Sequence, residues 1–216
     1  VISTANVSLI GEDREKVNIS FFDPVESPIG GDMSKRCAVY VTSGATNFTA
    51  ENLTIENTYE YIGDGSISNE SADALRVDAE GSMFINVKLV GYQDTLDASS
   101  NRQYYEKCYI TGNVDYIYGS AQVLFNDCDL VFRYSPIKNS GYVTAPRTDA
   151  SKYGYIFYNC RITAEDGCSG SKYLLARPWG ADGFAAFINC YMSDIINKTA
   201  PYGDMSGNKA SEARFM

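Results

Sequence analysis

The sequence contains no histidine in 216 residues. A chain without imidazole side chains cannot use a Ser-His-Asp or Cys-His mechanism, and it cannot build a zinc or iron site on histidine ligands. Acid and base chemistry near neutral pH would instead need carboxylate, Lys, Tyr or Cys side chains with shifted pKa values. The absence of histidine therefore directs attention to the carboxylates.

Metal-binding cysteine pairs and long apolar runs are also absent. The six cysteines include no CxxC pair, so thiolate zinc ribbons and thioredoxin-type redox sites fit poorly. No stretch approaches the roughly 18 apolar residues of a spanning helix, and the opening VISTANVSLIGED lacks the basic-then-apolar order of a signal peptide. We expect a mature or trimmed chain with no membrane partner.

Positive charge is scarce. Eighteen Lys and Arg residues oppose 27 Asp and Glu residues, which gives a net charge of -9 and a pI near 4.5. Binding to nucleic acid or to an anionic membrane requires a basic surface, so we expect no nucleic-acid partner. The 44% hydrophobic, 13% aromatic and 21% charged side chains are typical of a soluble globular protein, and we predict one domain over residues 1–216.

Six short segments share one pattern, and their spacing predicts the fold. They are FTAENLTIEN, SMFINVKLVG, QYYEKCYITG, VLFNDCDLVF, YIFYNCRITA and AAFINCYMSD, and each is predicted to be a strand. One polar position aligns at intervals of 34, 21, 20, 32 and 30 residues, at Asn52, Asn86, Lys107, Asp127, Asn159 and Asn189. Strands rich in Tyr, Phe, Val and Ile between Gly, Asn and Asp turns indicate an all-β protein. A unit of about 20 residues is the size of one rung in a right-handed single-stranded parallel β-helix, a solenoid of stacked coils.

Four cysteines recur with the same period, directly after the aligned position. They are Cys108, Cys128, Cys160 and Cys190. Stacked rungs would place them in one column along the core, and we interpret them as buried packing residues. Cys37 and Cys168 lie outside this column and could pair with each other.

Three insertions lengthen the rungs, at residues 60–71, 133–151 and 165–183. Loops on a rigid scaffold are where function is usually carried. We therefore expect these insertions to form a binding cleft.

Two aspartates have equivalent places in adjacent rungs. Asp94 follows Asn86 by eight residues, and Asp115 follows Lys107 by eight residues. Because adjacent parallel strands lie about 4.8 Å apart, the two carboxylates could face each other, with a repulsion of about 3 kcal/mol, or roughly 2 pKa units, at an effective dielectric of ~20. One would ionise normally while the other stays protonated towards neutral pH, which separates a nucleophile or base from a general acid. The alternative is that both are water-exposed turn residues.

Three motifs surround these aspartates in the order GYQDTL (91–96), GNVDYIYGSAQVLF (112–125) and LLARPWG (174–180). Together they resemble the pectin methylesterase family of carbohydrate esterases. ANVSLIGED, ENLTIENT (51–58), ADALRV (72–77) and ARF (213–215) are similar to further family segments. The resemblance covers nearly the whole chain and implies a right-handed parallel β-helix with a cleft for methyl-esterified polygalacturonan, acting as a monomer without a cofactor or metal.

The resemblance also implies roles for individual residues. Asp115 would be the nucleophile, and Asp94 the general acid that later activates water. Gln93 would donate to the oxyanion of the tetrahedral intermediate, Arg177 would hold Asp115 ionised, and Trp179 would stack on a sugar ring. Gln93 could alternatively be a turn amide, and Arg177 a surface ion pair worth under about 1 kcal/mol.

Three positions depart from the family pattern. Tyr118 stands where the family usually has a Phe lining the cleft, and core packing is an equally good interpretation of it. Ser71 replaces a Gln that would give a second oxyanion donor, a loss that typically costs about 10²–10³ in kcat unless a neighbour such as Asn69 substitutes. Asp97 stands where an aromatic residue is common. The chain also begins inside the family domain and stops after ARFM, so we expect truncation at both ends.

Two other functions share this fold. A pectate lyase would abstract a proton with Arg and Ca²⁺ held by clustered acids, for which the sequence offers no set of three or four carboxylates at ligand spacing. A non-catalytic glycan-binding module would tolerate Ser71. The esterase interpretation places the protein outside the cell or in a periplasm, where its polymer substrate is found.

Overall fold

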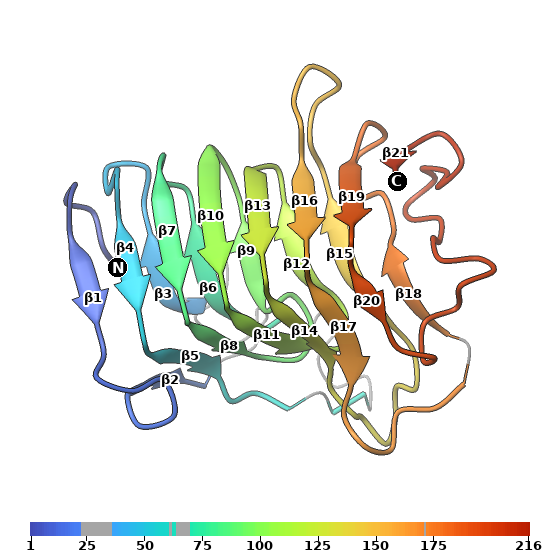
Figure 1. Cartoon of the computed structure of the whole chain (residues 1–216), viewed down its shortest axis with the longest axis horizontal. Helices are drawn as coiled ribbons and strands as arrows, with labels where there is room; N and C mark the ends of the chain where they lie inside the picture. The colour runs from blue at the N-terminus through green and yellow to red at the C-terminus, as the bar shows by residue number, and fades with distance from the viewer. Residues whose placement is uncertain (23–35, 61, 64–69, 171) are drawn as a thin grey trace.

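The computed structural model describes residues 1–22, 36–60, 62–63, 70–170 and 172–216. These ranges contain 21 strands in three parallel sheets, and none of them holds a helix long and apolar enough to cross a membrane. The rungs follow one another along the long axis, from the blue amino-terminal strands to the red carboxy-terminal ones (Figure 1). The predicted all-β class and parallel β-helix are confirmed.

Each sheet takes at most one strand from each rung. Sheet 1 consists of β1 (Ser8–Ile10), β4 (Thr49–Glu51), β7 (Ser82–Ile85), β10 (Arg102–Glu106), β13 (Gln122–Asn126), β16 (Tyr155–Tyr158), β19 (Phe184–Ile188) and β21 (Arg214–Phe215). Sheet 2 consists of β2 (Asn18–Phe21), β5 (Thr54–Asn57), β8 (Lys88–Val90), β11 (Tyr109–Gly112), β14 (Asp129–Phe132), β17 (Arg161–Ala164) and β20 (Tyr191–Met192). Sheet 3 consists of β3 (Cys37–Val41), β6 (Asp73–Val77), β9 (Leu96–Ala98), β12 (Val114–Gly119), β15 (Gly141–Pro146) and β18 (Tyr173–Ala176).

The chain turns from sheet 1 to sheet 2 at the aligned polar position of the repeat. All six residues there have φ between 52° and 55°, namely Asn52, Asn86, Lys107, Asp127, Asn159 and Asn189. This left-handed conformation is costly for most L-residues but accessible to Asn and Asp. In addition, Asn86 Nδ2 donates to Asn52 Oδ1 at 2.8 Å, so side chains at this turn also join successive rungs.

The strand prediction for the six repeat segments is wrong in one respect. Each segment contains two strands, because the left-handed residue ends the first strand and directs the chain into another sheet. The segment at 103–112, for example, divides into β10 and β11 on either side of Lys107 and Cys108.

Aromatic rings stack inside the coil beneath sheet 1. Phe84, Tyr105, Phe125 and Phe157 are fully buried, and their neighbouring ring centroids lie 4.6–4.9 Å apart. Stacked pairs of this kind contribute about 0.5–1.5 kcal/mol each beyond the burial of their area. The stack therefore helps to fix the spacing of the rungs that carry the site.

The predicted cysteine column is confirmed. Its first three members, Cys108, Cys128 and Cys160, are 1% exposed, and Cys190 is partly buried at its end. Each thiol donates to a backbone carbonyl of the preceding rung at 3.3–3.5 Å. The suggested pair does not form, since Cys37 and Cys168 have no disulfide.

Candidate active site

A cleft of about 220 Å³ lies over sheet 3. Its lining residues come from several rungs and are Ser71, Gln93, Asp94, Asp115, Tyr118, Ala145, Arg177, Trp179 and Met205. The described parts of the insertions at 60–71, 133–151 and 165–183 each contribute to this set, through Ser71, Ala145, Arg177 and Trp179. The expectation that the insertions border the cleft is confirmed for these residues, while the other five lie outside the insertions.

Asp94 and Asp115 occupy the same position in adjacent rungs, as the repeat register predicts. Gln93 pairs with Val114 in a parallel bridge, and the Asp94 N–H donates to the Val114 carbonyl at 3.1 Å. Both aspartates face the same cleft, and Asp115 is only 4% exposed. Asp94 is partly buried and lies at a bend of the chain. The alternative interpretation as water-exposed turn residues is therefore wrong for Asp115 and fits Asp94 only in part.

Both aspartates have left-handed backbones. The φ of Asp94 is 64° and that of Asp115 is 49°, a conformation that Asp adopts more readily than most other residues with a Cβ. Asp115 also lies in the register irregularity of β12 between Val114 and Ile117. Both carboxyl groups enter the cleft from this irregular backbone.

Arg177 holds Asp115 through two nitrogens. Its Nε lies 2.8 Å from Oδ1, and its terminal nitrogen lies 2.5 Å from Oδ2. The guanidinium also lies over the ring of Tyr142, 4.4 Å from the centroid. Two-point contact and stacking fix the direction of the carboxylate, as only a planar guanidinium can. Arg177 is thus part of the cleft and not a surface ion pair.

A chain of hydrogen bonds from Lys138 through Gln93 and Ser71 ends at Asp94. Lys138 Nζ donates to Gln93 Oε1 at 3.5 Å, Gln93 Nε2 donates to Ser71 Oγ at 3.2 Å, and Ser71 Oγ donates to Asp94 Oδ2. Because the oxygen of Gln93 faces Lys138, its NH₂ group is directed towards Ser71. The hydroxyl of Ser71 is engaged with Asp94, and Asn69, considered above as a substitute donor, lies outside the described residues.

The surroundings of Asp94 and Asp115 affect the pKa values of the two carboxyl groups differently. Burial, reinforced by the charge of Asp115, raises the pKa of Asp94 to about 7. Burial also raises the pKa of Asp115, but the hydrogen bonds and charge of Arg177 oppose that rise. When the pair carries one proton, that proton therefore resides on Asp94. The equivalent spacing of the two aspartates predicted that one of them would stay protonated towards neutral pH.

Two aromatic rings form a wall of the cleft. Tyr118 and Trp179 meet edge to face with centroids 5.8 Å apart, and Arg147 lies over the Trp179 ring at 4.7 Å. Trp179 keeps 36% of its surface exposed, which leaves it accessible to a ligand. Tyr118 lines the cleft and also packs, so the two interpretations of this residue do not exclude each other.

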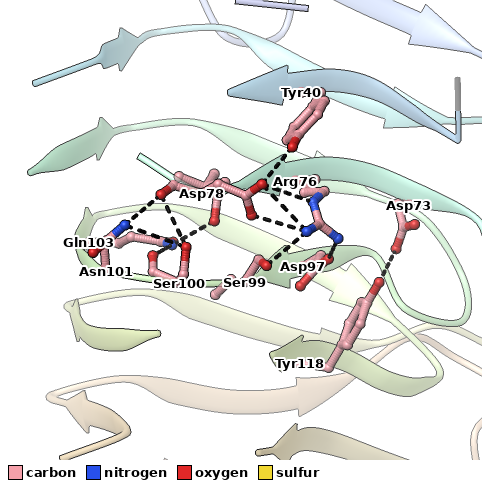
Figure 2. A network of polar contacts seen from close by, with 12 residues as sticks. Tyr40, Asp73, Arg76, Asp78, Asp97, Ser99, Ser100, Asn101, Gln103 and Tyr118 are labelled. Carbon is pink, nitrogen blue, oxygen red and sulfur yellow. Dashed lines mark hydrogen bonds and ion pairs between the residues drawn. The ribbon is translucent and has the colours of Figure 1, made fainter. Parts of the chain in front are cut away.

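Sequence reasoning missed Lys138 and Asp73. Lys138 lies in the second insertion, but nothing in its local sequence marks it. Asp73 stands 21 residues before Asp94, the same interval that separates Asp94 from Asp115, so the spacing could have revealed it. Asp97 was noticed as a departure, and its partner is Arg76, 2.6 Å away (Figure 2).

Comparison with known proteins agrees with this geometry. The pectinesterase family model matches residues 2–215. Pectinesterase 2 of Citrus sinensis is 31% identical over 223 residues, an alignment that includes all of this chain and 42% of the relative's length. The chain thus spans less than half of that relative.

Two solved structures are similar over nearly the whole chain. A pectin methylesterase from Erwinia chrysanthemi has a TM-score of 0.83 at 27% identity, covering 100% of this chain and 79% of that one. A pectin methylesterase in complex with a hexasaccharide has a TM-score of 0.81 at 27% identity, covering 98% of this chain and 78% of that one. The QDTL, VDYIYG and RPW segments meet in one cleft of a parallel β-helix, and the family model matches residues 2–215. The chain therefore belongs to the pectinesterase family.

Proposed function

We propose that this protein hydrolyses the methyl esters of polygalacturonan to carboxylate and methanol. The observation that carries the proposal is the pairing of Asp115, held by Arg177, with Asp94, whose pKa is raised to about 7, in one cleft of adjacent rungs. An anionic oxygen nucleophile beside a carboxylic acid can cleave an ester without histidine.

In the first half of the reaction, an oxygen of Asp115 attacks the ester carbonyl carbon. The carbonyl oxygen becomes an oxyanion, for which Gln93 Nε2 is the donor at hand. Asp94 then gives its proton to the departing methoxide as the C–O bond breaks. Methanol leaves, and the galacturonyl group remains joined to Asp115 as an anhydride.

In the second half, the Asp94 carboxylate takes a proton from water. The resulting hydroxide equivalent attacks the galacturonyl carbon, the anhydride bond breaks, and Asp115 is released as a carboxylate. Arg177 stabilises that carboxylate as leaving group. The cycle consumes one water and restores the proton on Asp94.

Trp179 and Tyr118 are the sugar-contacting residues in this proposal. An aromatic face beside a polar cleft matches the apolar face of a pyranose ring, and the contact of Arg147 with the Trp179 ring helps to hold the indole in place. Ser71 contributes to the site through its bond to Asp94. The net charge of -9 favours a nearly neutral methylated polymer over its anionic product.

The function is tested with highly methylated pectin. We expect release of methanol with no increase in absorbance from unsaturated sugars. Unsaturated product without methanol would indicate a lyase. Binding to pectin with neither product would indicate a non-catalytic module, for which the engaged hydroxyl of Ser71 is the best argument.

The proposed substrate also indicates where the protein acts and what it binds. Methylated pectin is a polymer outside cells, so we place the protein in the extracellular space or a periplasm. We further propose that it acts as a monomer, since one chain supplies Asp94, Asp115 and Arg177 and the proposed reaction needs no residue from a second subunit.

A further inference from the structure

A third aspartate lies in register with the two of the proposed mechanism. β6 pairs with β9 so that Leu75 faces Leu96. The Ala72 N–H donates to the Gln93 carbonyl at 3.1 Å, and the Ala74 N–H to the Thr95 carbonyl at 2.9 Å. These bonds bracket Asp73 and Asp94, so Asp73, Asp94 and Asp115 hold equivalent positions in three successive rungs.

Asp73 is fully buried, and its surroundings favour the neutral form. Its Oδ1 accepts a hydrogen bond from the Tyr118 hydroxyl at 2.9 Å (Figure 2), and its Oδ2 has no hydrogen-bond partner within the described part of the chain. In the described part of the chain it has no ion pair, since Arg76 pairs with Asp97 and Asp78 and Arg36 acts on Asp73 through its charge alone. A buried carboxyl with one neutral donor and no ion pair is a carboxylic acid.

Most of the charged and titratable groups around Asp73 favour its neutral form, while the hydrogen bond from Tyr118 and the charge of Arg36 oppose it. They come from four neighbouring segments and are Arg36 and Cys37, Arg76, Asp94 and Asp97, and Tyr118. Burial raises the pKa of Asp73 well above its ordinary range, and the charges of Asp97 and Asp94 act in the same direction.

We propose that Asp73 is a positioning residue, which as a neutral acid anchors the Tyr118 hydroxyl and so fixes the aromatic wall that meets the substrate. That the wall of Tyr118 and Trp179 contacts a methylated sugar rests on the proposed function. With its hydroxyl bound to Asp73, Tyr118 offers its apolar ring to the cleft beside Trp179, which suits a methyl ester. A free hydroxyl would admit other ring orientations and a polar group into the cleft.

The requirement for neutrality follows from the register. An ionised Asp73 would place a second negative charge one rung from Asp94 and would raise the pKa of Asp94 further. A neutral Asp73 holds Tyr118 without changing the acid. The side chain therefore positions the wall while leaving the acid-base pair alone.

The test compares Asp73→Ala, Asp73→Asn and the matched control Tyr40→Phe. Tyr40 also donates to an aspartate, Asp78 Oδ2 at 2.6 Å, but it does not line the cleft. We expect Asp73→Ala to lower kcat/KM about tenfold, mainly through KM, and to weaken calorimetric binding of a methyl-esterified hexagalacturonate by a similar factor. Asp73→Asn should recover most of this loss, because its amide oxygen accepts the same bond. It should also leave unchanged the alkaline limb of the pH profile, which is the fall in kcat/KM expected above about pH 7 as Asp94 loses its proton. Tyr40→Phe should change neither KM nor binding.

Three results would overturn the proposal: wild-type KM and binding in Asp73→Ala, an Asp73→Asn variant as impaired as Asp73→Ala, or a shift of the alkaline limb in Asp73→Asn.

A double-mutant cycle with Asp73→Val and Tyr118→Phe guards against misfolding, since losing both partners should destabilise less than the sum of the single losses. Additive stability losses would mean that the two side chains are not linked. Failure of the proposed function is a separate result, because wild type would then release no methanol while the binding and stability readouts still report on Asp73.

Discussion

Arg177 and Asp115 are joined by a contact that depends on shape as well as charge. Two guanidinium nitrogens meet two carboxylate oxygens, and Tyr142 supports the plane from one side. Lysine would keep the charge but could not reproduce either the fork or the stacking. The nucleophile would then lose its fixed direction while staying ionised.

We therefore expect Arg177→Lys to reduce kcat about 100-fold while changing KM less. Steady-state methanol release over a range of pectin concentrations measures both parameters. A variant with the wild-type rate and an unchanged pH profile of kcat/KM would show that the guanidinium is not needed.

Ser71 acts on the acid rather than on the nucleophile. Its hydrogen bond favours the ionised form of Asp94 and lowers the pKa that burial and Asp115 have raised. In wild type, activity needs Asp94 protonated, so kcat/KM should fall as the pH rises through about 7. Its acidic limb should reflect protonation of Asp115.

Ser71→Ala removes that bond, so the pKa of Asp94 should rise and the alkaline limb should move to higher pH. We expect a shift of up to about one pH unit, measured as kcat/KM between pH 5 and 9. A limb that stays in place, or moves to lower pH, would contradict the role of this hydroxyl. Thr148→Ala, which removes a buried hydroxyl outside the cleft, is the matched control and should leave the limb in place.

At the scale of elements, the left-handed turn between sheets 1 and 2 recurs in six rungs, and one member is poorly suited to it. Lys107 has a φ of 52°, where Asn or Gly would be less strained. Its side chain is 63% exposed, and among the residues that the structure describes it has one distant ionic contact, with Glu106 at 3.9 Å. The side chain therefore offers little to offset the strain.

Lys107→Asn should stabilise the protein by about 0.5–1 kcal/mol, a rise in Tm of roughly 1–4 °C for a chain of this size. Differential scanning calorimetry measures the change. Lys172→Asn, at an exposed position without positive φ, is the control and should have little effect. Equal Tm changes in both variants would show that the turn is not strained.

The repeat interval predicted the stacking of rungs and the pairing of Asp94 with Asp115, because a solenoid converts sequence spacing directly into register. It did not reveal that each repeat segment bends, since a left-handed Lys107 or Asp127 looks like any polar residue within a strand. Lys138 could not be predicted, because its contact with Gln93 joins residues 45 positions apart through an irregular loop. Asp73 was not singled out within ADALRV, although its distance of 21 residues from Asp94 places it in the same register.

At the scale of the whole molecule, buried acids should make stability depend on pH. Asp94 and Asp97 have pKa values raised to about 7 and about 6, and that of Asp73 is also raised. The folded state therefore binds more protons than the unfolded state between about pH 4 and pH 7. The free energy of unfolding must fall as the pH rises through that window.

Replacing Asp94 by Asn should weaken this dependence. We expect the decrease in unfolding free energy between pH 5 and pH 8 to be smaller than in wild type by at least about 1 kcal/mol. Urea unfolding at several pH values measures it. The same decrease in both proteins would mean that Asp94 titrates at its ordinary pKa and is not the acid proposed here.

The central claim is that Asp115 and Asp94 together cleave the ester, and initial rates of methanol release from highly methylated pectin test it most directly. Asp115→Asn and Asp94→Asn should each lose at least about 10³-fold in rate, while circular dichroism and pectin binding remain near wild type. Asp129→Asn, on the distant sheet 2, should keep the wild-type rate. A folded Asp115→Asn or Asp94→Asn variant that retains most of the wild-type rate would contradict the claim.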